Sequence, residues 1–139
     1  MMDERYPLQV SEVVILTQED INAYARASGD FNPIHVDEEY ARKTPFGGTI
    51  AHGLLLTGIV SEIMTREFGA LWCKYGILKT RFKNPAKPGD TLTFTASRRD
   101  NSSAGTASVY DVLCVNQRQE TIIEGQARIV QPTPEPGRV

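Results

Sequence analysis

The sequence contains little cysteine, no long hydrophobic run and no excess of basic side chains. Its two cysteines, Cys73 and Cys114, are too few for a disulfide framework and lack the paired spacing of a zinc site, so we interpret both as small buried side chains. Fifteen lysines and arginines against seventeen acidic residues give a net charge of -2, which argues against a nucleic-acid partner. No segment approaches the roughly 20 apolar residues of a membrane span, and the first five residues lack the apolar core of a signal peptide. We therefore expect a cytoplasmic protein with no membrane partner.

The composition is that of one folded domain. With 139 residues, 40% of them hydrophobic and 23% charged, the chain can build one sizeable core but not two. Prolines crowd the end of the sequence, where they oppose regular structure. We expect a single domain over residues 1–131 and a flexible C-terminal tail over residues 132–139.

The first half of the chain predicts helices and loops. A short strand near Val10–Leu16 precedes a helix that begins at Thr17, where Asp20 supplies the acidic residue of a capping box. Gly29 offers the left-handed residue that closes this helix, and Asp37 caps a second, short helix. These signals leave Asp30–His35, between the two helices, as a turn.

A long helix and a set of strands follow. The helix is predicted over Ala51–Phe68, where apolar residues cover most of the circumference, so we expect it to be buried on most sides. From Leu71 onward the pattern has the period of strands, clearest where Leu92, Phe94 and Ala96 alternate with polar residues. Polar breaks divide this half into about four strands joined as an antiparallel meander. The breaks lie at residues 84–90, 100–105 and 116–120.

This order of elements predicts an α+β domain. A curved antiparallel sheet of about five strands, wrapped around the long central helix, would hide so apolar a cylinder, and this is the hot-dog fold. The exposed edges of such a sheet favour pairing with another copy, so we expect a homodimer or a dimer of dimers.

A carboxylate and an imidazole lie close together in residues 28–35, Ser-Gly-Asp-Phe-Asn-Pro-Ile-His. On a continuous helix Asp30 and His35 would point about 140° apart, but Gly29 and Pro33 oppose a continuous helix, so the chain can fold back and bring both side chains to one water. Such a pair can take a proton from water and return one elsewhere, which suits addition or elimination of water. The same residues also fit a helix end followed by an Asx turn without any chemistry.

The sequence around this turn also resembles a known family. The string Tyr24-x-x-Ala27-Ser28-Gly29-Asp30-x-Asn32-Pro33-Ile34-His35, followed after five residues by Ala41, resembles the signature of the MaoC-like (R)-specific enoyl-CoA hydratases. The block Ala51-His52-Gly53-Leu54 is similar to that family's second motif, and the resemblance covers nearly the whole chain as one hot-dog unit. It implies that Asp30 and His35 activate one water for reversible syn addition to a trans-2-enoyl thioester, which gives the (3R)-hydroxyacyl thioester.

The resemblance also implies roles for three further residues, one catalytic and two supporting. Asn32 would steady the dyad or the water, Gly53 would donate its backbone N–H to the thioester oxygen, and Ser61 would play a supporting role. Negative charge builds on that oxygen during the addition, and a helix N-terminus offers free N–H groups and the positive end of the helix dipole. For Gly53 the alternative is a glycine that simply opens the helix.

The remaining polar residues carry weaker signals. We interpret His52 as structural and outside the dyad, and Glu62 on the apolar helix has no assigned role. Several basic residues could meet the phosphates of coenzyme A or an acidic carrier protein, or could be solvated strand ends, so the residues that bind the cofactor portion of the substrate stay unassigned. These basic residues are Arg81, Lys83, Lys87, Arg98 and Arg99.

Three rival functions stay open. A metal hydrolase could use Asp30, His35 and Asp37, but a second histidine is near only if folding recruits His52. A hot-dog acyl-CoA thioesterase would hydrolyse the C–S bond instead of hydrating the double bond. A silent acyl-thioester-binding module would keep the pocket without the chemistry.

We therefore predict a hydro-lyase of fatty-acid metabolism, an (R)-specific enoyl-CoA hydratase that needs no metal or other cofactor. The alternative within this class is a (3R)-hydroxyacyl-carrier-protein dehydratase of fatty-acid or polyketide synthesis, which runs the same chemistry backward. The sequence leaves open the chain length, the carrier of the thioester and the physiological direction. Chain length would depend on side chains along the buried helix, such as Leu54, Leu55 and Ile59.

Overall fold

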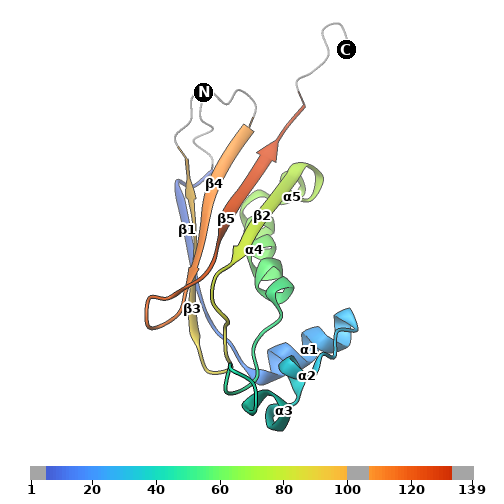
Figure 1. Ribbon diagram of the computed structural model, residues 1–139. Coiled ribbons are helices and arrows are strands. Elements are labelled where there is room, and N and C mark those ends of the chain that lie inside the picture. The colour runs from blue at the N-terminus through green and yellow to red at the C-terminus, as the bar shows by residue number, and fades with distance from the viewer. Residues whose placement is uncertain (1–5, 100–106, 133–139) are drawn as a thin grey trace, which may run out of the picture.

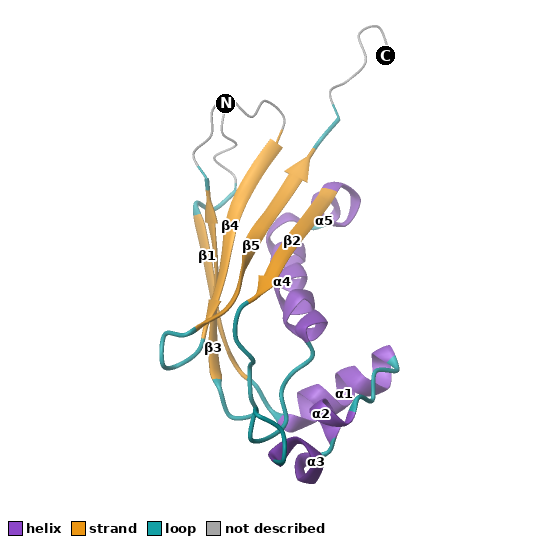
Figure 2. Cartoon of the chain, viewed as in Figure 1, coloured by secondary structure: helices purple, strands orange, loops and turns teal. Residues whose placement is uncertain are grey.

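A computed structural model of the protein describes residues 6–99 and 107–132 (Figure 1). Within them, one antiparallel sheet of five strands carries a long helix along one face (Figure 2), which confirms the predicted α+β architecture. The strands are β1 (Gln9–Ile15), β2 (Gly76–Phe82), β3 (Thr91–Arg98), β4 (Ala107–Val115) and β5 (Thr121–Val130). The helices are α1 (Gln18–Ser28), α2 (Pro33–Val36), α3 (Glu38–Arg42), α4 (Gly53–Phe68) and α5 (Ala70–Tyr75).

The hydrophobic core lies between α4 and the sheet. Leu56, Val60 and Met64 recur on one side of α4 and are buried. In β3 the buried Leu92 and Phe94 alternate with more exposed threonines, as the sequence pattern predicts. Each such side chain contributes roughly 1.5–3 kcal/mol when it is fully buried, so this contact fixes where α4 lies on the sheet.

Capping side chains position the short helices at the end of the molecule where α4 begins (Figure 1). Thr17 and Asp20 form the predicted capping box, with side chain to backbone distances of 3.1 and 3.0 Å. Gly29 ends α1 with a φ of 79°, and the Asp37 side chain caps α3, both as predicted. The caps set the bends that place the segment between α1 and α3 beside the start of α4.

The strand predicted from Leu71 onward begins only at Gly76. The residues before it form α5, because Trp72 is buried and its indole N–H donates to the Ser61 hydroxyl of α4 at 2.9 Å. So short an apolar segment has no period that separates a helix from a strand. Packing against α4 decides between the two.

The strands do not form a simple meander. β3, β4 and β5 follow one another as predicted, but the sheet order is β1-β3-β4-β5-β2, so β2 pairs with β5 and β3 pairs with β1. The connection from β2 to β3 is long enough to cross the sheet, so chain order does not determine which strands pair. The predicted break at residues 100–105 lies outside the described residues, as does the predicted tail beyond residue 132.

Two predictions of burial are wrong. α4 begins at Gly53, and Leu54 on its outer side is 65% exposed, because the sheet covers the helix on one side only. Cys73 on α5 is exposed. Cys114 in β4 is buried as predicted, and this burial raises the pKa of its thiol to about 12. No helix in the described part of the chain is long and apolar enough to cross a membrane.

Candidate functional site

The segment between α1 and α3 combines an Asx turn with a short helix. The Asp30 carboxylate accepts the Asn32 N–H at 3.1 Å, and the Asn32 side chain accepts the Ile34 N–H at 3.2 Å and so caps α2. The turn predicted to run as far as His35 therefore gives way to a helix at Pro33, because the fixed φ of proline suits the first helical position. This bend returns the chain toward Asp30.

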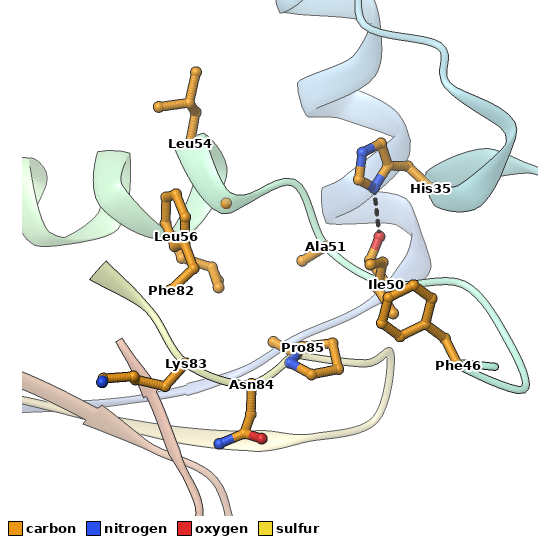
Figure 3. Close-up of a pocket in the computed structure, with 12 residues that line it drawn as sticks. His35, Phe46, Ile50, Ala51, Leu54, Leu56, Phe82, Lys83, Asn84 and Pro85 are labelled. Atoms are coloured by element: carbon orange, nitrogen blue, oxygen red, sulfur yellow. Dashed lines mark hydrogen bonds between the residues drawn. The ribbon is translucent and has the colours of Figure 1, made fainter. Parts of the chain in front are cut away.

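Asp30 and His35 lie side by side. One ligand atom from each of Asp30, His35 and His52 lies within 4.8 Å of the other two. The Nδ1 atom of His35 is 2.8 Å from the Ile50 carbonyl oxygen (Figure 3). A carbonyl oxygen can only accept, so Nδ1 carries a proton and Nε2 of the neutral ring is free to accept one. The folding back that the sequence predicts thus brings the acid and the imidazole within reach of one water.

His52 belongs to the same cluster, although the sequence indicates only a structural residue. Its ring stacks on His35 with centroids 3.8 Å apart and 25° between the planes. Its Nε2 atom lies 3.0 Å from the carbonyl oxygen of Asp30, and the whole residue is buried. The signal for it in the sequence is its place directly before Gly53 in one short motif.

An apolar pocket of about 460 Å³ opens beside this cluster (Figure 3). His35 lines the pocket from α2, and Gly53 lines it from the start of α4. Leu56 and Phe82 add apolar walls, and Phe82 comes from the end of β2. Asp30 lies next to His35 but does not itself line the pocket. The pocket therefore offers apolar walls with an imidazole and a helix N-terminus at its edge.

Gly53 combines a free N–H with a close approach to an aromatic ring. As the first residue of α4 it has no intrahelical acceptor, and its N–H makes no hydrogen bond to any of the described residues. A Cβ atom at Gly53 would lie 2.7–2.9 Å from ring atoms of Phe82. A side chain at residue 53 would therefore displace the Phe82 ring, a contact across the pocket that no local pattern in the sequence reveals.

Ser61 lies apart from the dyad. It is two turns along α4 from Gly53, about 12 Å at 1.5 Å per residue. Its hydroxyl accepts the hydrogen bond from Trp72, so it ties α5 to α4. Any support it gives to the site acts through the placement of the long helix.

A network of polar side chains also holds the His35 segment, and no pattern in the sequence predicts it. Gln18 of α1 donates to the His35 carbonyl at 2.9 Å and accepts from the Thr49 hydroxyl at 2.6 Å. The backbone N–H of Thr49 donates to the Glu38 carboxylate at 3.2 Å. The segment that carries Ile50, the acceptor for the His35 ring, is therefore bonded to both α1 and α3.

Three of the five basic residues considered for phosphate binding have partners within the chain. Lys83 lines the pocket, and its ammonium group lies 3.2 Å from the Glu124 carboxylate. The ammonium group of Lys87 donates to the Phe46 carbonyl at 2.7 Å, and Arg99 pairs with an aspartate of β4. These contacts fit the alternative of paired, solvated strand ends.

The cluster also contains the ligand types of a metal site. Asp30, His35 and His52 are the carboxylate and two imidazoles that such a site would use, so folding does recruit His52. Asp37, the third ligand expected from the sequence, caps α3 instead. One nitrogen of each imidazole already bonds a carbonyl oxygen. The groups that could still bind a metal ion are therefore His35 Nε2, His52 Nδ1 and the Asp30 carboxylate.

Comparisons with known proteins agree with one another. The model of a family described as MaoC like domain matches residues 2–117. The chain is 35% identical over 122 residues to the 3-hydroxyacyl-thioester dehydratase Z of Mycobacterium tuberculosis, covering 85% of this chain and 78% of that protein. It is 31% identical over 117 residues to the (R)-specific enoyl-CoA hydratase of Rhodospirillum rubrum, covering 84% and 81%. The unliganded R-hydratase PhaJ1 from Pseudomonas aeruginosa superposes with a TM-score of 0.76 at 26% identity, over 91% of this chain and 81% of that one.

Proposed function

Because the chain belongs to the family of MaoC-like domains, whose relatives are named hydratases and dehydratases, it is a hydro-lyase, and we propose that it adds water to trans-2-enoyl-CoA with (R) specificity. One observation carries this proposal. The acid Asp30 and the imidazole of His35 lie within 4.8 Å of each other, beside an apolar pocket that His35 and Gly53 line. The apolar walls suit an acyl chain, and the two side chains suit a shared water.

In the proposed reaction the Asp30 carboxylate and His35 Nε2 hold one water between them. They take a proton from this water as its oxygen bonds to C3, and they return a proton to C2 on the same face. The double bond becomes a single bond, the product is the (3R)-hydroxyacyl thioester, and the protein ends with the protons it began with. Asn32 supports this step by fixing the turn that holds Asp30.

The start of α4 supplies the second part of the mechanism. Addition at C3 builds negative charge on the thioester carbonyl oxygen, and the free N–H of Gly53 can donate to it. The dipole of α4 adds positive potential at the same place. Removal of one such donor typically costs about 2.7–4 kcal/mol in the transition state, so this contact is a main contribution to the rate. In this proposal Ser61 has a supporting role, because it keeps α5 packed on α4.

Gly53→Ala should lower kcat/KM by about tenfold to a hundredfold with little change in Tm. The new methyl group would meet the Phe82 ring, which is 55% exposed and can turn across the pocket, away from its present place. A misplacement of about 1 Å at a reacting group can cost a hundredfold in rate. Steady-state kinetics of enoyl-CoA hydration would measure this loss.

A double-mutant cycle separates the two ways in which that methyl group can act. If the displaced ring blocks the substrate, Phe82→Ala should restore much of the activity of Gly53→Ala. If the methyl group itself keeps the thioester from the N–H, the double variant stays as slow as Gly53→Ala. Wild-type kcat/KM in Gly53→Ala would contradict this prediction, because neither the displaced ring nor the methyl group would then hinder the substrate.

The function itself is tested by hydration of a short and a long trans-2-enoyl-CoA with the wild-type chain. We expect the conjugated enoyl absorbance to fall and chiral analysis to give the (R) product. An (S) product, or no turnover of either substrate, would contradict the proposal. The same acyl chains on a carrier protein would identify the dehydratase alternative, since that enzyme would prefer the carrier-bound thioester.

Two rivals give different signals in this assay. A thioesterase would release free thiol, which a thiol reagent detects, whereas a hydratase leaves the C–S bond intact. A metal hydrolase is favoured by the cluster of Asp30, His35 and His52, and its activity would be lost with a chelator. We expect neither thiol release nor sensitivity to chelation.

Pairing of two copies is supported by the edge of the sheet. β2 is an edge strand, and its Ile77 and Phe82 are exposed, as is Leu54 on α4. Unpaired strand edges beside apolar side chains favour association. The homodimer therefore stays part of the proposal, and the cytoplasmic location stays a prediction.

A further inference from the structure

His52 contacts each part of the proposed machinery. It directly precedes Gly53, its ring stacks on His35 at 3.8 Å, and its Nε2 lies 3.0 Å from the Asp30 carbonyl oxygen. Tyr24 of α1 packs on it, with centroids 4.7 Å apart. We propose that His52 is a positioning residue, which holds the Asp30 carboxylate, the His35 imidazole and the Gly53 N–H in fixed positions relative to one another. This inference rests on the proposed function.

The hydrogen bond to Asp30 gives the first step of the argument. The acceptor is a carbonyl oxygen, so His52 Nε2 carries a proton and donates. The N–H of Asp30 donates to the Ser28 hydroxyl at 3.2 Å, so the peptide groups on both sides of this residue are held. The backbone of Asp30 is therefore held on both sides, and its carboxylate, which accepts the Asn32 N–H at 3.1 Å, is held in one orientation.

The second nitrogen of His52 shows that the residue does more than fill space. Nδ1 is buried and has no hydrogen-bond partner among the described residues. A buried polar atom without a partner is unfavourable, and a phenylalanine ring would occupy similar space without that cost. What the imidazole adds over an apolar ring is the Nε2–H that reaches Asp30.

The stack on His35 acts on the orientation of the reacting ring. The bond from His35 Nδ1 to the Ile50 carbonyl opposes a flip of this ring, since a flip would exchange Nδ1 and Nε2. The parallel face of His52 opposes a tilt of the ring plane. Together the two contacts leave Nε2 of His35 aimed in one direction, as a proton acceptor for a bound water requires.

Three substitutions separate the donor from the ring. His52→Gln places an amide N–H near the position of Nε2 but has no ring, and His52→Phe keeps the ring without the donor. His52→Asn is too short to reach Asp30 and has neither feature. We expect kcat to fall by about tenfold or more in His52→Asn and by a smaller factor in the other two, with KM within about twofold of wild type.

A control distinguishes positioning from general stability. Asn116 is also buried and polar, and it organises the turn between β4 and β5 by accepting from the N–H groups of Arg118 and Glu120. Asn116→Ala should lower Tm and leave kcat unchanged. A purely structural His52 would behave in the same way, with a lower Tm and the kcat of the folded protein intact.

The outcomes are distinct. A folded His52→Asn variant with wild-type kcat, or one whose KM rises while kcat holds, overturns the inference. If His52→Asn does not fold, wild-type kcat in both His52→Gln and His52→Phe overturns it. If the wild-type chain is active and loses activity in Asp30→Asn but keeps it in every His52 variant, the inference about His52 is refuted and the proposed function stands. An inactive wild-type chain removes the proposed function, and this inference with it.

Discussion

Asp30→Asn should reduce kcat for enoyl-CoA hydration by at least about a hundredfold while the chain still folds. The amide keeps the shape of the side chain and an oxygen that can accept the Asn32 N–H, so the turn is retained. It has no negative charge and cannot take a proton from water, so the bound water is not activated. The rate of loss of enoyl absorbance measures this effect.

A matched control for this change is Asp37→Asn. Asp37 is an exposed carboxylate that caps α3, and asparagine is an equally good cap. We expect kcat within about twofold of wild type in that variant. Near wild-type kcat in a folded Asp30→Asn protein would mean that its carboxylate takes no part in the chemistry.

His35→Ala should cause a loss of similar size, again at least about a hundredfold in kcat. The substitution removes Nε2, the free nitrogen that faces the site, and also the bond from Nδ1 to the Ile50 carbonyl. Gln18 bonds the backbone of residue 35 rather than its side chain, so the local fold should survive. Turnover of enoyl-CoA and the thermal melting curve measure the two properties separately.

His35→Asn isolates the role of the second nitrogen. Its amide N–H can take the place of Nδ1 and keep the bond to Ile50, but nothing replaces Nε2. If proton transfer is the role of His35, this variant is as slow as His35→Ala. Recovery of most of the activity would instead show that His35 only holds the loop and that the base lies elsewhere.

The local signals in the sequence predicted the site loop well. The capping box at Thr17, the left-handed Gly29 and the cap at Asp37 all depend on residues a few positions apart, so their chemistry can be read directly. The departure at Pro33, where a short helix replaces the end of the turn, is also a local effect of proline at a first helical position.

The elements that the sequence misassigned depend on packing between distant segments. α5 is helical because Trp72 is buried and bonded to Ser61, and the same residues without α4 fit a strand equally well. The exposure of Leu54 follows from a sheet that covers only one side of α4. No periodicity within either segment contains this information.

The sequence by itself determined that the chain bends after the first helix, so that a carboxylate and an imidazole can meet there, because glycine, asparagine and proline act over a few bonds of the backbone. Only the tertiary structure decided that His52 stacks on His35 and that Phe82 closes over Gly53. Those contacts join α4 to α2 and to β2, and their geometry follows from where burial of the apolar face of α4 sets that helix on the sheet.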